Sequence, residues 1–226
     1  MSVMVIPDHA VVIELDHIVV AARRLGEGVD WIEDRLGVRP DPGGTHDGFG
    51  THNALLRLGD DVYLEVLAPD PAQPRPTRPR LFGLEDEICR SLLVHGPSLL
   101  HWVVRTRDLP GAIAALVGCA GNPEAVLGIA SHMRRGDLSW TLTIRPDGAR
   151  PPDGLPSVID WGEAPHPCAR LPDRGVVLEQ LNVEAPNATV SALALLRDPR
   201  VVITRRERST LVARLRSPSG AAVVLR

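Results

Sequence analysis

The sequence predicts an α+β fold in which two βαβββ units share one core and a third unit of the same kind follows. The order strand, helix, strands occurs twice, at a spacing of roughly 85 to 95 residues, far longer than a solenoid period. A histidine has the same place in both opening strands, and both units end on Ala-Pro-x-Pro, at 68–71 and 164–167. Two such copies indicate a pseudo-two-fold pair.

The first unit covers residues 11–70. Its opening strand, at 13–21, is rich in β-branched residues, and an amphipathic helix is expected at Leu25–Leu36, ended by Gly37. The stretch Asp41–Gly50 is rich in glycine, aspartate and histidine and is predicted to be a loop. The remaining strands of this unit are expected at 52–58 and 62–67.

The second unit, 98–168, follows a proline-rich linker with a short helix at 71–97. Its first strand is expected at 99–106, and its helix is expected to start at the cap Asp108 and run to Val117. Three apolar segments complete the unit, at 125–132, 138–145 and 155–161.

The third unit, 175–226, has the pattern of the other two without their polar residues. Gln180 is its nearest equivalent to His17, and its last strand carries no carboxylate. It is predicted to be structural, covering a sheet or forming a dimer contact. Its expected elements are a strand at 176–185, a helix at 188–196 and strands at 200–204, 210–216 and 221–225.

Composition excludes several classes of protein. With 44% apolar residues the chain can bury a core, and its net charge of -3 is spread over both signs, so nucleic acid is not an expected partner. No apolar run approaches the ~20 residues that span a bilayer, and no secretory signal is evident, so a cytoplasmic location and no membrane partner are expected. The three cysteines, Cys89, Cys119 and Cys168, form no CxxC pair and are predicted to be reduced packing residues.

Four ionisable residues interrupt apolar strands. Glu65 lies within Val62–Leu67, where a carboxylate is costly unless it is paired or binds a metal, and alternation places it on one face with Tyr63 and Leu67. By the repeat, the other three are His17 and His101 in the opening strands and Asp160 in the last strand of the second unit.

Two imidazoles and two carboxylates are a ligand set suited to a divalent transition metal, namely zinc, iron, manganese, nickel or cobalt. The predicted metal ligands are therefore His17, Glu65, His101 and Asp160. A metal that holds two vicinal oxygens of a substrate polarises its carbonyl, while a released carboxylate acts as base. Plain buried pairs of histidine and carboxylate remain an alternative.

Loop residues supply further candidates. His52 is the candidate proton shuttle, with His46 as an alternative, and Asn53 is expected to reach over the cleft. Arg134, or its neighbour Arg135, could hold an anionic substrate, although a charged hairpin turn is the preferred interpretation. The predicted substrate contacts are Asn53, Arg134 and Trp161, and Trp161 is equally compatible with ordinary packing. The sequence has no GxSxG elbow, no phosphate-binding glycine loop and no GxGxxG after a strand.

The segments LDHIVV, GGTHDGFGTHNALLRLG, YLEVLAPDP and LPSVIDWGEAPHP resemble the glyoxalase-like domain family of the vicinal-oxygen-chelate superfamily. The likeness covers nearly all of 13–225. It implies paired βαβββ units that form a cupped, mostly antiparallel half-barrel around a metal. By position, the superfamily's ligands fall on His17, Glu65, His101 and Asp160. Members include glyoxalase I, extradiol dioxygenases, epimerases and resistance proteins, and a carboxylate as the fourth ligand favours isomerase, lyase or epimerase chemistry over oxygen activation.

Two functions are therefore expected. The first is a metal-dependent isomerase- or lyase-type enzyme that acts on a small vicinal-oxygen substrate with Glu65 and His52 as catalytic residues. The second is a metal-free small-molecule binding or resistance protein of the same fold. A small molecule is the expected partner in both, and a homodimer is a possibility.

Overall fold

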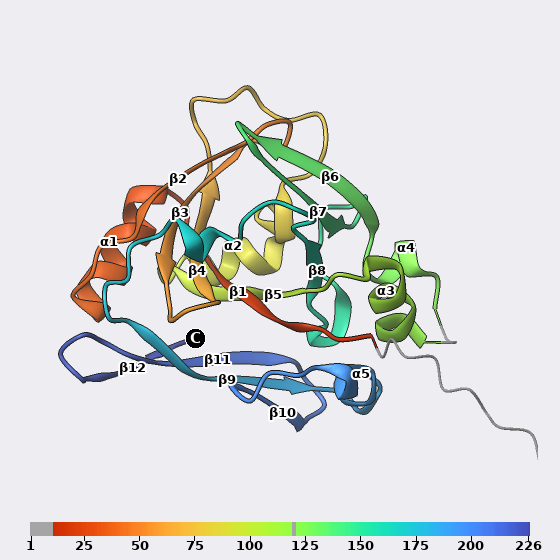
Figure 1. Cartoon of the computed structure of the whole chain (residues 1–226). Coiled ribbons are helices and arrows are strands. Elements are labelled where there is room, and N and C mark those ends of the chain that lie inside the picture. The colour runs from red at the N-terminus through yellow and green to blue at the C-terminus, as the bar shows by residue number, and fades with distance from the viewer. Residues whose placement is uncertain (1–10, 119–120) are drawn as a thin grey trace, which may run out of the picture.

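One curled sheet of eight strands, in the order β2-β3-β4-β1-β5-β8-β7-β6, is the centre of the computed structural model, which describes residues 11–118 and 121–226 (Figure 1). The central strands β1 and β5 are antiparallel, and they join the two repeated units. The two βαβββ units predicted from the sequence are confirmed. The strands of this sheet are β1 (Glu14–Ala21), β2 (Asp41–His46), β3 (Thr51–Arg57), β4 (Tyr63–Pro69), β5 (Ser98–Arg105), β6 (Ile129–Arg135), β7 (Leu138–Ile144) and β8 (Ser157–Asp160).

A crossover helix follows the first strand of each unit. Helix α1 (Leu25–Leu36) starts and stops as predicted, because Gly37 takes a left-handed φ of 69° at its end. Helix α3 (Leu109–Val117) is capped by Asp108, whose side chain accepts a hydrogen bond from the backbone N–H of Gly111. In both units the first and last strands are parallel neighbours, β1 with β4 and β5 with β8.

The prediction of a loop at Asp41–Gly50 is wrong for its first part, which forms strand β2. Strand β2 pairs with β3 from Asp41 opposite Leu55 to His46 opposite Thr51. An edge strand tolerates proline and glycine, and the glycines are needed here because Asn53 lies against this strand. A Cβ added to Gly43 would lie 2.1 Å from Oδ1 of Asn53.

A second sheet of four strands, in the order β10-β9-β11-β12, covers the convex face of the first. Its element order matches the prediction, but its pairing differs from the other units: β9 is parallel to β10 and antiparallel to β11, and β12 lies at an edge. The elements are β9 (Val177–Ala185), α5 (Asn187–Ala192), β10 (Val201–Arg205), β11 (Thr210–Arg216) and β12 (Ala222–Leu225).

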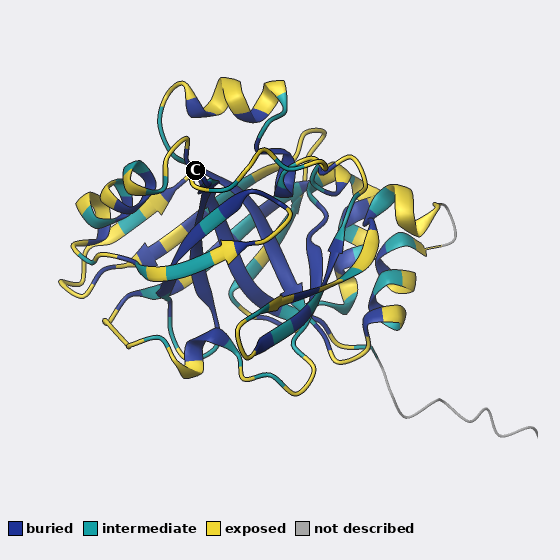
Figure 2. Ribbon diagram, turned by 90° about the horizontal axis from the view of Figure 1, so that it is seen from above, coloured by how far each residue is buried: buried dark blue, intermediate teal, exposed yellow. Residues whose placement is uncertain are grey.

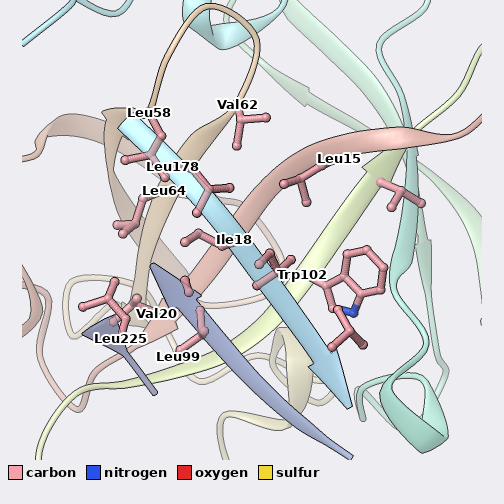
Figure 3. Close-up of a cluster of buried hydrophobic side chains, with 14 of the residues drawn as sticks. Leu15, Ile18, Val20, Leu58, Val62, Leu64, Leu99, Trp102, Leu178 and Leu225 are labelled. Carbon is pink, nitrogen blue, oxygen red and sulfur yellow. The ribbon is translucent and has the colours of Figure 1, made fainter. Parts of the chain in front are cut away.

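The main core fills the space between the two sheets (Figure 3). Trp102 is fully buried there, and its ring N–H donates to the carbonyl of Gly154 at 3.0 Å, which satisfies its one polar atom. Figure 2 shows the buried strands in the middle of the molecule with exposed helices and loops around them. Members contributed by both sheets include Leu15, Ile18, Val20, Leu64, Leu99, Leu178, Leu215 and Leu225.

The concave face holds a second apolar cluster, and the candidate site lies on that side. Residues that alternate with the main core point into it, among them Val19, Val103 and Ile159. The 3₁₀ segment Leu81–Gly83 and the helix α2 (Glu87–Leu93) pack against this cluster. The edge strands β2 and β6 contact each other, so the curl nearly closes the sheet over the concave side (Figure 1). The short helix α4 (Pro123–Val126) precedes β6.

None of the helices in the described residues has the length and apolar character required to cross a bilayer. Cys89 and Cys168 are buried thiols outside any disulfide, and burial raises their pKa values to about 11 and about 12, respectively. Both are therefore protonated packing residues, as expected. Cys119 lies outside the described residues.

Candidate active site

A small cavity of about 40 Å³ lies on the concave face between the two units. By volume it has room for about three water molecules. One end is polar and the other is apolar, formed by side chains such as Phe82, Trp140 and Ile159. The polar lining residues are His17, His46, Asn53, Tyr63, Glu65, Arg135 and Trp161.

A β-bulge places Asp16 and His17 side by side at this cavity. Leu15 pairs with Val104 and His17 with Val103, so Asp16 is one extra residue in β1. Neighbouring side chains of a regular strand point to opposite faces, but here Asp16 Oδ1 lies 2.6 Å from His17 Nδ1. The bulge also turns Leu15 into the main core, on the other face from His17.

Asp16 is a fully buried carboxylate with several donors. Besides His17, it receives Trp161 Nε1–H at 2.8 Å and lies 3.2 Å from His166 Nε2. Burial alone would raise the pKa of Asp16, but the hydrogen bonds and electrostatic interactions with His166 and His17 lower it well below its ordinary value. Asp16 is therefore ionised at neutral pH.

An ionised carboxylate only accepts hydrogen bonds, so both imidazoles must donate to Asp16. His166 Nδ1 accepts the backbone N–H of Cys168, which agrees with a proton on His166 Nε2. For His17, the proton is on Nδ1 and the lone pair is on Nε2. The Nε2 atom of His17 thus presents its lone pair to the cavity, while Asp16 fixes the orientation of the ring.

Glu65 is held by Asn53 on the neighbouring strand. Asn53 Nδ2 donates to Glu65 Oε1 at 2.6 Å and lies 3.4 Å from His46 Nε2. Its Oδ1 accepts the backbone N–H of Gly44 at 2.8 Å, which fixes the orientation of the amide. Burial lowers the pKa of His46, with opposition from the charge of Glu65, so His46 is a neutral acceptor here.

The remaining oxygen of Glu65 faces His17. Oε2 of Glu65 and Nε2 of His17 are 3.6 Å apart, which is too long for a hydrogen bond. Among the described residues, neither atom has a hydrogen-bond partner. Tyr63 stacks on the His17 ring at 4.5 Å, and burial followed by the charges of Asp16 and Glu65 raises its pKa well above the usual value. Two acceptors, Nε2 of His17 and Oε2 of Glu65, thus face the cavity beside the protonated phenol of Tyr63.

The second unit does not repeat this pair. Val19 pairs with Glu65 in the first unit, and its equivalent Val103 pairs with Ser157, so Ser157 has the place of Glu65. His101 Nε2 lies 3.0 Å from Ser157 Oγ and accepts the Ser157 backbone N–H at 3.2 Å. Burial, with additions from Arg150 and His17, lowers the pKa of His101 well below its ordinary value.

Asp160 points away from the cavity. Ile159 packs in the concave cluster, so the next side chain in the strand faces the other way. Asp160 Oδ1 accepts the backbone N–H of Gly162 at 2.8 Å and thus holds a turn. Of the four predicted ligands, the structure brings His17 and Glu65 together and places His101 and Asp160 in other contacts.

The described residues fit a four-ligand metal poorly. They contain no group of three or more histidine, cysteine, aspartate or glutamate side chains arranged to hold an ion. On the concave face, the last strand of the second unit has Ser157 and Ile159 where a metal site would need a carboxylate. Neither side chain is a good ligand for a divalent transition metal. His17 and Glu65 are the two donors of the predicted set that remain near each other.

Of the other predicted site residues, two line the cavity and two lie elsewhere. Asn53 and Trp161 line the cavity, but both are engaged with acids of the site, Glu65 and Asp16. His52 instead lines a groove of about 810 Å³ between α1 and β2, with Nδ1 3.7 Å from Asp70. Arg134 is exposed and donates to Gly136 in its own hairpin, which is the turn role preferred above.

Sequence reasoning missed Asp16 and did not favour Arg135. The available signal for Asp16 was a carboxylate directly before a histidine in an apolar strand. Only the β-bulge brings that carboxylate to the same side of the strand as His17. Arg135 lines the cavity beside Asn53, while Arg134 does not, because successive side chains of β6 alternate.

Stability is expected to fall as the pH drops below about 6.5, the ordinary histidine value. His46 and His101 have lowered pKa values in the folded protein, so the unfolded chain takes up their protons first on acidification. The free energy of unfolding should therefore drop by up to about 1.4 kcal/mol per pH unit for each of them, and level off above pH ~7. Urea unfolding at pH 7.5, 6.5 and 5.5 measures this. His101→Gln should show a smaller slope than wild type, and equal slopes would contradict the assignment.

Residues 15–197 match the glyoxalase-like domain family. The chain belongs to this family. The match spans both units that share the curled sheet and reaches into the third, so the predicted resemblance is confirmed. No curated protein matches the sequence.

Three solved structures are similar to this glyoxalase-like protein, and the first of them shares its fold. A hypothetical protein from Staphylococcus aureus is 15% identical with a TM-score of 0.59, over 95% of this chain and 99% of that chain. Methylmalonyl-CoA epimerase from Mycobacterium tuberculosis is 21% identical with a TM-score of 0.42, over 66% and 87%. A variant of the Streptomyces coelicolor epimerase in complex with 2-nitronate-propionyl-CoA is 18% identical with a TM-score of 0.44, over 68% and 97%. At these identities the similarity to the first concerns the fold alone, and the weaker similarity to the epimerases carries no conclusion about the reaction of this chain.

Proposed function

We propose that this glyoxalase-like protein is an enzyme of the isomerase or lyase type that moves a proton on a small oxygenated substrate inside the cavity. The observation that supports the proposal is the pair of facing acceptors, Nε2 of His17 and Oε2 of Glu65, 3.6 Å apart at the cavity wall. A substrate proton presented between them has a base on either side. Pairs of titratable groups in a closed cavity are a recognised feature of acid–base sites.

Each group has a distinct role in this proposal. Glu65 Oε2 is the base, since Asn53 holds the other oxygen and prevents the carboxylate from turning away. His17 is the second base, because its Nδ1–H is donated to Asp16 and its Nε2 lone pair faces the cavity. When Glu65 takes a proton from a carbon next to a carbonyl, the electron pair moves to the carbonyl oxygen as an enolate. Exchange of the Glu65 proton with solvent and its return to the same carbon give the deuterated acid, and its transfer to another atom of the enolate gives an isomer, so no oxidant or reductant is required.

The family resemblance implies a divalent metal, which would polarise the carbonyl. Because Ser157 replaces the second carboxylate and Asp160 faces away, the donor set of this chain does not fit the four-ligand site. The proposed reaction is therefore carried by side chains, with Arg135 as the group that faces the developing negative charge.

Deuterium uptake tests the proposal without knowledge of the natural product. Pyruvate and hydroxypyruvate are incubated with the protein in D₂O, and the C3 proton signals are followed by NMR. We expect exchange above the uncatalysed rate for at least one acid, with the same rate in EDTA. Exchange that EDTA abolishes and a divalent metal restores would favour the metal-dependent reaction instead. Binding without any exchange would favour the metal-free binding protein.

A further inference from the structure

Arg135 reaches across the mouth of the curled sheet into the cavity. It is the last residue of β6, and its Nη1 donates to Asn53 Oδ1 on β3 at 3.3 Å. The guanidinium carbon lies 5.9 Å from the ring centre of Trp140. Gly44 of β2 makes room for it, because a Cβ there would lie 2.5 Å from Cδ of Arg135. The side chain is thus placed by residues of three different strands.

The positive charge of Arg135 is not neutralised by any acid of the described chain. Within those residues, no carboxylate oxygen lies within 4.0 Å of its guanidinium, whereas the part-buried Arg105 and Arg200 pair with acids at 2.9 and 2.7 Å. A guanidinium has five N–H donors in a planar fork, and the one long bond to Asn53 uses a single donor. Its charge also reaches His46, whose pKa it helps to lower after burial. The remaining donors are available to an anion in the cavity.

The cavity limits the anion to a small one. A volume of about 40 Å³ corresponds to about three waters, which is the space of an organic acid with two or three carbons. Arg135 and the proposed base Glu65 contact the two ends of the same Asn53 amide group, so an anion held by Arg135 shares the cavity with that base. Apolar neighbours such as Phe82 and Leu142 line the rest of the space.

We propose that Arg135 binds the carboxylate of the substrate, and that the substrate is a small monocarboxylic acid with a carbonyl next to the carboxylate. The fork of Arg135 would take both carboxylate oxygens, and the carbon on the far side of the carbonyl would point toward Glu65 and His17. This inference rests on the proposed function for the reaction and adds the class of substrate. Binding by itself requires no catalytic step.

Calorimetric titration of the full chain with pyruvate, glycolate and acetate tests the inference. Saturable binding of pyruvate is expected, tighter than that of glycolate or acetate, which lack the carbonyl, and Arg135→Gln should weaken pyruvate binding by about 10- to 100-fold, the loss for a charge-assisted hydrogen bond. Arg134→Gln is the matched control, since that neighbour is exposed and bonded to its own hairpin, and it should leave the Kd unchanged. Arg135→Lys keeps the charge without the fork and should give an intermediate Kd.

Two further measurements, one with a neutral analogue and one with a Glu65 variant, separate binding by Arg135 from the proposed reaction. Pyruvamide, which has the shape of pyruvate without the charge, should bind wild type no better than it binds Arg135→Gln. Glu65→Gln removes the proposed base and a negative charge, so it should bind pyruvate at least as tightly as wild type. Equal pyruvate affinity in wild type and Arg135→Gln, or no binding of pyruvate, would overturn the inference. Intact binding with no deuterium exchange would overturn only the proposed reaction.

Discussion

Glu65→Gln is expected to reduce deuterium exchange at C3 of the bound acid by about 10²- to 10⁴-fold, the usual contribution of a general base. Glutamine has the size of glutamate and can still accept the Asn53 N–H, so the strand and the cavity should be preserved. It has no basic oxygen to face His17. The exchange rate by NMR, at equal occupancy of the variant and wild type, measures the effect.

Asp160→Asn is the matched control for this variant. The sequence pattern assigns Asp160 the same role as Glu65, but the structure places its carboxylate on the backbone N–H of Gly162, a bond that asparagine can also make. Its exchange rate should equal that of wild type. A loss in Asp160→Asn as large as in Glu65→Gln would contradict the register of β8.

Asp16→Ala is expected to lower the free energy of unfolding by about 3 to 5 kcal/mol, the cost of leaving buried partners unpaired. The variant removes the common acceptor of His17, His166 and Trp161. The loss should be large because Asp16 is 0% exposed, so water cannot replace the carboxylate without opening the core. Urea unfolding at pH 7.5 gives the difference in free energy.

Asp137→Ala provides the comparison. Its carboxylate also has a charged partner, Arg170 at 2.9 Å, but the side chain is 75% exposed. Water and salt screen such a pair, and the midpoint of unfolding should be almost unchanged. Similar losses in the two variants would mean that the hydrogen bonds at Asp16 are not the source of stability proposed here.

Much of the fold could be predicted because local signals and the repeat agree. Helix α1 has clear helical periodicity and a glycine stop, and its bounds were predicted to the residue. Strand β2 could not be found in this way, because its residues are polar and small. It is a strand only through pairing with β3 at an edge, which is a tertiary effect.

The candidate site was predictable where strands are regular. On β4, simple alternation placed Glu65 with Tyr63 and Leu67, and the structure agrees. In β1 the bulge at Asp16 shifts the alternation, and β5 has a second bulge at Leu100. One extra residue reverses the face of every side chain beyond it, and nothing in the local sequence marks where that residue is.

The second-unit carboxylate and the arginine depend on long-range geometry. Overlay of the two sequences put Asp160 on Glu65, but the parallel pairing of β5 with β8 puts Ser157 there. The loop before β4 and the loop before β8 differ in length, so spacing along the sequence does not determine which residue of β8 pairs with β5 at this position. Arg135 reaches the cavity only because the sheet curls until β6 meets β2, which no local pattern of residues 129–135 reveals.

A crystal structure with pyruvate bound tests the central claim most directly, namely that one cavity brings an anion-binding arginine and two bases to a single small acid. We predict a carboxylate within about 2.7 to 2.9 Å of the Arg135 guanidinium. The methyl carbon should lie within about 3 to 3.5 Å of Glu65 Oε2, the separation of a reactive geometry. Pyruvate bound outside this cavity, or inside it with its carboxylate turned away from Arg135, would contradict the account.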